Sequence, residues 1–210
     1  MSAIIKNIIF DLGQVLLDLD KKKCLDAFSE AGFTTAGELL EQNKRNQLFG
    51  AYECGDITSA EFRNAVRSMC TTNCSDNEID AIWNTMLVAI PIEKLHFLIE
   101  LRKRYKVCLL SNTNEIHWDY IVAHFFEQQG IKPEACFDYI FLSYKMKEKK
   151  PNSAIYQKAL ETGNMKPEET LFIDDLKENC QAAAALGIQT IHLTPGSSLP
   201  AVVSSFLTTL

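Results

Sequence analysis

Short apolar runs recur along the chain, and in each of them β-branched residues, Leu and Phe follow one another without polar alternation. An unbroken apolar run of this length is typical of a strand in a parallel sheet that is covered on both faces. The sequence predicts strands over Ile4–Phe10, Val107–Ser111, Tyr139–Leu142, Leu171–Ile173 and Thr190–Leu193.

Helical patterns separate the later strands. They are expected over about 92–105, 153–161 and 177–186, and Gly187 supplies a C-cap for the last of them. Strands that alternate with helices predict an α/β fold with a Rossmann-like, doubly wound parallel sheet. The tail, 195–210, is expected to form a loop followed by a packing helix.

The first half of the chain departs from this alternation. No strand-like run lies between Asp11 and Val107, and the segment from about 21 to 89 carries amphipathic helical patterns instead. One apolar helical face, which we expect to pack in the core of this segment, contains Ile79, Ile82, Trp83 and Met86. We therefore expect an all-helical domain inserted into the α/β core. The predicted boundaries are 1–17 and 91–210 for the core and 18–90 for the insert.

Composition and charge restrict the partners. The chain has 210 residues and a formal net charge of −6, so it has no basic surplus with which to bind nucleic acid or an acidic membrane. A small phosphate in a locally positive pocket remains compatible with this charge. The seven cysteines are scattered without zinc spacing, and the N-terminal apolar run is too short for a signal peptide or a membrane span. We expect reduced thiols and a cytoplasmic location, and the sequence leaves the oligomeric state open.

Reactive side chains follow the ends of the predicted strands. Asp11 follows the first strand, Ser111 ends the second, Lys150 comes after the third, and Asp174 and Asp175 follow the fourth. Ligands of open α/β sheets bind at the carboxyl ends of the strands, so these groups are expected to converge. An aspartate can attack phosphorus to form an acyl-phosphate, and a divalent cation held by carboxylate oxygens can offset the repulsion between the two anions. The lysine and the serine hydroxyl can hold the remaining phosphoryl oxygens.

Four motifs in this order, FDLG, LLSNTN, KKP and FIDD, resemble those of the haloacid dehalogenase-like (HAD) superfamily. The helical insert resembles the C1 cap of that superfamily, and the resemblance covers essentially the whole chain. The stretches FDLGQVLLDLD and LLSNTNEIHWDYI are most similar to a bacterial subgroup that resembles α-D-glucose-1-phosphate phosphatase.

The resemblance implies a role for each motif residue. The implied catalytic residues are Asp11 as the nucleophile, Ser111 and Lys150. The implied Mg²⁺ ligands are Asp11, Asp175 and the backbone carbonyl of Gly13, with Asp174 supporting the metal or its waters. The candidate substrate-binding residues are Ser111, Asn112 and Lys150 in the core, and Tyr52 and Glu53 in the insert.

Gly13 departs from the family pattern, in which an aspartate usually stands two residues after the nucleophile. That aspartate protonates the leaving group, a contribution worth about 10²–10⁴-fold in rate. Three explanations stay open: the substrate has a good leaving group, Glu53 or His117 replaces the acid, or the protein binds phosphorylated ligands and catalyses poorly. A fourth is metal-free dehalogenation by Asp11, although dehalogenases usually carry an aromatic residue at position 13.

The sequence thus predicts a Mg²⁺-dependent phosphomonoester hydrolase that forms an aspartyl-phosphate at Asp11. A cap that closes over the site and excludes bulk water indicates a small phosphorylated metabolite, such as a sugar phosphate.

Overall fold

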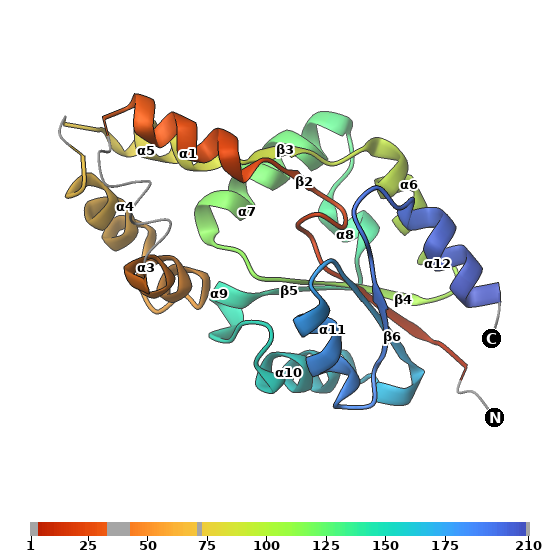
Figure 1. The fold of residues 1–210 in the computed structure, drawn as a ribbon. Coiled ribbons are helices and arrows are strands. Elements are labelled where there is room, and N and C mark those ends of the chain that lie inside the picture. The colour runs from red at the N-terminus through yellow and green to blue at the C-terminus, as the bar shows by residue number, and fades with distance from the viewer. Residues whose placement is uncertain (1–3, 33–42, 71–72, 209–210) are drawn as a thin grey trace.

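A parallel sheet forms the centre of the computed structural model, which describes residues 4–32, 43–70 and 73–208. Within these residues the sheet has five strands in the order β5-β4-β1-β6-β7 (Figure 1). The strands are β1 (Asn7–Phe10), β4 (Lys106–Ser111), β5 (Tyr139–Leu142), β6 (Thr170–Asp174) and β7 (Gln189–His192). All the predicted strands are present, so the predicted doubly wound α/β class is confirmed. The first strand begins later than predicted, and Ile4 is 78% exposed.

Both faces of the sheet are buried, which explains why its strands lack polar alternation. Successive side chains of a strand point to opposite faces. Ile8 and Phe10 therefore pack on one side of β1, and Ile9 packs on the other. The same alternation divides the side chains of β4 and β6 between the two faces.

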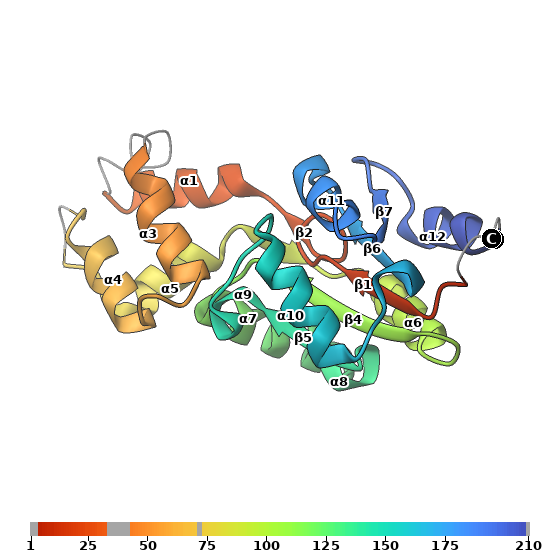
Figure 2. The same ribbon diagram turned by 90° about the horizontal axis from the view of Figure 1, so that it is seen from below.

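Helices cover each face as a separate layer (Figures 1 and 2). One layer contains α6 (Ile92–Leu101), α7 (Glu115–Ile121), α8 (Pro133–Cys136) and α12 (Leu199–Thr208). The other layer contains α10 (Ser153–Gly163) and α11 (Lys177–Ala184). Shorter elements connect them: a π-helical turn (Val122–Phe126), 3₁₀ turns (Glu127–Gln129 and Pro167–Glu169) and α9 (Ser143–Met146). The predicted helices and the C-terminal packing helix are present, although α6 ends four residues before the predicted boundary.

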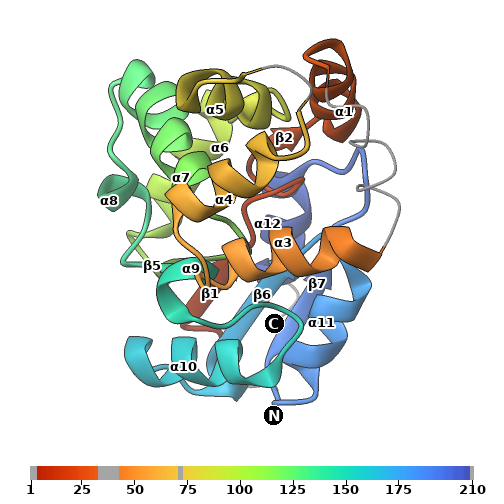
Figure 3. The same ribbon diagram turned by 90° about the vertical axis from the view of Figure 1, so that its left-hand side faces the viewer.

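Four helices lie together beyond the carboxyl ends of the strands and have an apolar core of their own (Figure 3). We call them the cap: α1 (Lys21–Glu30), α3 (Asn43–Glu53), α4 (Ser59–Arg67) and α5 (Asp76–Asn84). Their core contains Phe28, Phe62 and Trp83, so Trp83 packs as its helical pattern predicts.

A short antiparallel ribbon stands where the chain leaves the core and where it returns. Strand β2 (Asp18–Leu19) pairs with β3 (Leu87–Ala89), and the Asp20 amide donates to the Met86 carbonyl at 2.8 Å. The prediction of no strand between Asp11 and Val107 is therefore wrong. Strands of two and three residues are too short to show a periodic pattern.

The described residues contain no helix that is both long and apolar enough to cross a membrane.

His117 joins the cap to the core. Its ring stacks on Trp83 with 4.7 Å between the centroids, and its Nε2 lies 3.2 Å from the Trp83 carbonyl oxygen. Its Nδ1 lies 3.2 Å from Nδ2 of Asn114. A neutral ring satisfies both contacts, because Nε2–H donates to the carbonyl and Nδ1 accepts from the amide. Burial lowers the pKa of His117 to about 4.

This burial predicts a pH-dependent loss of stability. Above pH 6.5 the imidazole is neutral in both states, whereas between about pH 6.5 and 4 only the unfolded chain takes up the proton. The free energy of unfolding should therefore fall in this window by about 2–3 kcal/mol more in the wild type than in His117→Asn. Urea unfolding from pH 4 to 8 measures the difference. His96→Asn, at an exposed position, is the control, and a pH-independent difference between wild type and His117→Asn would contradict the prediction.

Candidate active site

Three carboxylates meet at the carboxyl ends of two paired strands. Asp11 follows β1, Asp174 ends β6, and Asp175 comes next. One oxygen from each side chain lies within 4.8 Å of the other two. The backbone amide of Asp11 donates to the carbonyl of Ile173 at 2.9 Å, so the pairing of the strands continues into the site. The parallel register therefore sets the spacing of the carboxylates.

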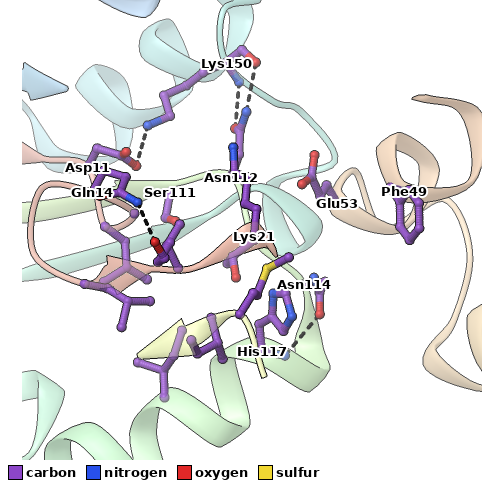
Figure 4. A pocket seen from close by; sticks show the side chains of 18 of the residues that line it. Asp11, Gln14, Lys21, Phe49, Glu53, Ser111, Asn112, Asn114, His117 and Lys150 are labelled. Carbon is purple, nitrogen blue, oxygen red and sulfur yellow. Dashed lines mark hydrogen bonds and ion pairs between the residues drawn. The ribbon is translucent and has the colours of Figure 1, made fainter. Parts of the chain in front are cut away.

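Lys150 forms ion pairs with two of these carboxylates, and Figure 4 shows the pair with Asp11. Its Nζ lies 2.6 Å from Oδ1 of Asp11 and 2.7 Å from Oδ2 of Asp174. The Asp174 carboxylate also accepts hydrogen bonds from the Leu176 amide at 2.8 Å and from Nδ2 of Asn179 at 3.0 Å. Asp174 is completely buried, and these donors fix its orientation.

The pKa shifts at the site come first from burial and then from the charges of the neighbouring groups. Burial and, to a smaller extent, the charge of Asp174 raise the pKa of Asp11 to about 6 despite the attraction of Lys150. Burial and the Asp174 charge also raise the pKa of Asp175. Burial lowers the pKa of Lys150, but the two bound carboxylates outweigh this effect and raise it above its ordinary value. The lysine therefore stays protonated.

The residues present fit a magnesium ion. Three carboxylates face one ammonium group, which leaves two negative charges without a partner among these four side chains. Carboxylate oxygens are hard donors of the kind that Mg²⁺ takes, and the ion commonly keeps several waters besides.

The turn after β1 brings an apolar side chain against position 13. The Gln14 backbone is left-handed with φ of 58°, and its side-chain amide donates to the Leu19 carbonyl at 2.9 Å. A Cβ added at Gly13 would lie 2.9 Å from Cδ1 of Leu19, the far end of a flexible side chain. The backbone at Gly13 is not left-handed, so a side chain there would require only that Leu19 move.

The segment after β4 holds Lys150 in place. Nδ2 of Asn112 donates to the Lys150 carbonyl, and the Lys150 amide donates to Oδ1 of Asn112, each at 2.9 Å. Ser111 is buried and lines the same pocket as Asp11. The Asn112 side chain thus holds the backbone of Lys150, a contact that is separate from its predicted contact with phosphate.

A cavity of about 360 Å³ lies between these groups and the cap. Core residues form its floor, including Asp11, Gly13, Ser111, Asn112, Lys150 and Asp175. Cap residues form the opposite wall, including Lys21, Leu25, Phe49, Glu53 and Trp83.

Glu53 and Tyr52, the two candidates from the insert, differ in their placement. Glu53 lines the cavity. Tyr52 instead stacks on Phe62 with 4.3 Å between the centroids, and its hydroxyl contacts Ser59 and the amide of Ile116. The structure therefore corrects the expectation for Tyr52, which lies in the cap core because that face of α3 meets α4.

Two further side chains, Lys149 and Asn179, contact residues of the site. Nζ of Lys149 lies 3.7 Å from Oε2 of Glu53, and Lys149 lines the cavity. Asn179 orients Asp174, as its position one helical turn after Asp175 allowed. His117 lines the cavity, but both ring nitrogens are engaged, so it is a poor replacement for a general acid.

Comparison with known proteins gives matches over almost the whole chain. A family model described as haloacid dehalogenase-like hydrolase matches residues 8–193. A D-ribitol-5-phosphate phosphatase of Bacteroides thetaiotaomicron is 31% identical over 193 residues, which cover 92% of this chain and 94% of that protein.

Solved structures agree with these matches. A HAD family enzyme of Bacteroides thetaiotaomicron superposes with a TM-score of 0.92 at 40% identity, over 95% of this chain and 98% of that one. Structures of that enzyme include a complex with magnesium and inorganic phosphate. A predicted HAD-like hydrolase of Porphyromonas gingivalis superposes with a TM-score of 0.88 at 30% identity, over 98% of both chains. The chain belongs to the haloacid dehalogenase-like hydrolase family.

Proposed function

We propose that the protein is a Mg²⁺-dependent phosphomonoester hydrolase that acts on a small phosphorylated metabolite with several hydroxyl groups. The observation that carries the proposal is the Asp11 carboxylate, bound by a buried lysine beside two further carboxylates on the floor of a cavity. Similarity to a D-ribitol-5-phosphate phosphatase supports the substrate class, and the magnesium and phosphate complex of the related enzyme supports the cofactor.

In the proposed reaction an oxygen of Asp11 attacks phosphorus, and the bond from phosphorus to the leaving oxygen breaks. The electron pair goes to the leaving oxygen, which takes a proton from solvent water because position 13 carries no acid. Water then attacks the phosphorus of the aspartyl-phosphate, which releases inorganic phosphate and regenerates the carboxylate. Lys150 and the hydroxyl of Ser111 hold phosphoryl oxygens, and Asn112 keeps the lysine in position.

Asp11, Asp175 and the carbonyl of Gly13 are the proposed ligands of Mg²⁺, and Asp174 orients Lys150 and the waters of the ion. When bound, the ion would offset the repulsion between the carboxylate and the phosphate.

We also propose that 18–90 acts as a C1-type cap on a core of 1–17 and 91–210. The separate apolar core of the cap helices and the ribbon of β2 and β3 support this division. Closure of the cap would exclude bulk water from the cavity.

Gly13 favours a second candidate function, a phosphate-ligand-binding protein with little turnover. Position 13 offers no proton to the leaving group, and Leu19 lies over it. The two candidates differ in the rate at which phosphate is released.

One prediction of the proposed function concerns the nucleophile. Asp11→Asn keeps the shape of the side chain but removes its charge and nucleophilicity. Phosphate release from D-ribitol 5-phosphate should fall on the order of 10⁴-fold or more. EDTA should abolish the wild-type activity, and added Mg²⁺ should restore it.

Asp26→Asn, at an exposed carboxylate of α1, is the matched control and should retain wild-type activity. Activity that survives in Asp11→Asn, or that is independent of Mg²⁺, would show that the mechanism is wrong.

Another prediction of the proposed function concerns the missing acid. Gly13→Asp should exceed Gly13→Ala in kcat by about 10²-fold for an alkyl phosphate, whose leaving group needs a proton. The two variants should be nearly equal for p-nitrophenyl phosphate, whose leaving group needs little help. The Ala variant carries the same contact with Leu19 and so isolates the effect of the carboxyl group. If the ratio of kcat between Gly13→Asp and Gly13→Ala were the same for both substrates, the natural site would not lack an acid.

A further inference from the structure

The wall of the cavity near the cap combines apolar side chains with two opposite charges, one from the cap and one from the core. Leu25, Phe49 and Trp83 supply apolar side chains. Glu53 comes from the end of α3, and Lys149 comes from the core segment that leads to Lys150. Oε2 of Glu53 and Nζ of Lys149 lie 3.7 Å apart, so this ion pair connects the cap to the core across the cavity.

A glycine inside α3 makes room for the ammonium group. Gly50 lies one helical turn before Glu53, and a Cβ at that position would lie 2.9 Å from Nζ of Lys149. A glycine within a helix weakens it, because its unfolded backbone has more freedom to lose. The absence of a Cβ at Gly50 lets Nζ of Lys149 approach the helix there, while the Lys149 side chain stays 39% exposed.

The end of α3 is fixed to the core by hydrogen bonds. The buried hydroxyl of Ser143 donates to the Glu53 carbonyl at 2.6 Å and contacts the backbone of Thr113. The ammonium group of Lys147 donates to the carbonyl of Gly55. These contacts hold the backbone of Glu53 against the core segment that carries Lys149.

The pair leaves hydrogen-bonding capacity on both partners. A separation of 3.7 Å is longer than a hydrogen bond between charged groups, so the carboxylate can accept and the ammonium group can donate elsewhere. A hydroxyl both donates and accepts, and it can therefore contact Glu53 and Lys149 together. A second anionic group would face the Glu53 carboxylate, and an alkyl chain would leave both charges without a new partner.

We propose that Glu53 and Lys149 form a hydroxyl-selecting subsite for the leaving group of the substrate. The subsite rests on the proposed function and adds its specificity: a polyhydroxylated phosphate ester binds with one hydroxyl between the two charges. Gly50 is the positioning residue that admits the ammonium group.

The test compares D-ribitol 5-phosphate with n-pentyl phosphate, which has the same chain length and no hydroxyl groups. Wild-type protein should favour the polyol ester in kcat/KM. Glu53→Gln and Lys149→Met should each lower that preference by about 10-fold or more, mainly through KM, because a hydrogen bond to a charged group is lost. Lys22→Met and Asp26→Asn, from an exposed ion pair on α1, are the matched controls and should keep the wild-type preference.

Gly50→Ala distinguishes an effect on substrate preference from an effect on protein stability. Alanine favours the helix, so thermal stability should be kept or raised, whereas its Cβ displaces the ammonium group and should lower the preference for the polyol ester. If the three variants lost kcat/KM equally on both esters, these residues would have a purely structural role and the subsite would be overturned. Variants that kept wild-type kcat/KM on both esters would overturn it as well. A wild-type protein that hydrolyses neither ester would overturn the proposed function as well.

Discussion

The ammonium group of Lys150, held between Asp11 and Asp174, is the interaction on which the rest of the site depends. Burial of a charged group costs free energy unless the group is paired and hydrogen-bonded. Burial of Lys150, Asp11 and Asp174 therefore requires that all three be correctly placed. The register of β1 and β6 places the carboxylates, and the amide of Asn112 fixes the lysine backbone. A fold in which Lys150 is paired with both carboxylates therefore also places Asp11, the proposed nucleophile.

The same cluster sets the chemistry because its charges do not cancel. Burial and mutual repulsion raise the pKa values of Asp11 and Asp175, which means that the site gains free energy from additional positive charge. A divalent cation held by Asp11 and Asp175 would supply that charge and would offset the charge of a phosphate dianion. In the proposed mechanism the protonated Lys150 binds phosphate without giving up its contacts to the carboxylates, since an ammonium group has three donors.

Much of this arrangement could be predicted from the sequence because it rests on local signals. Strands buried on both faces read as unbroken apolar runs, and the reactive residues follow those runs directly. Contacts between separate elements could not be read in this way. Tyr52 and Glu53 are neighbours on α3, and only the packing of α4 and α9 decides that one enters the cap core while the other faces the cavity. Lys149 stands among neighbouring lysines in the sequence, and only the fold brings its Nζ close to Gly50 and Glu53.

The central claim is that Asp11 carries the phosphoryl group during turnover. Acid quenching during steady-state turnover, followed by borohydride reduction and peptide mass spectrometry, tests it directly, because borohydride reduces an acyl-phosphate to an alcohol. The account predicts reduction at Asp11, only in the presence of both substrate and Mg²⁺. Turnover without a modified Asp11, or with modification of another carboxylate such as Asp175, would contradict it.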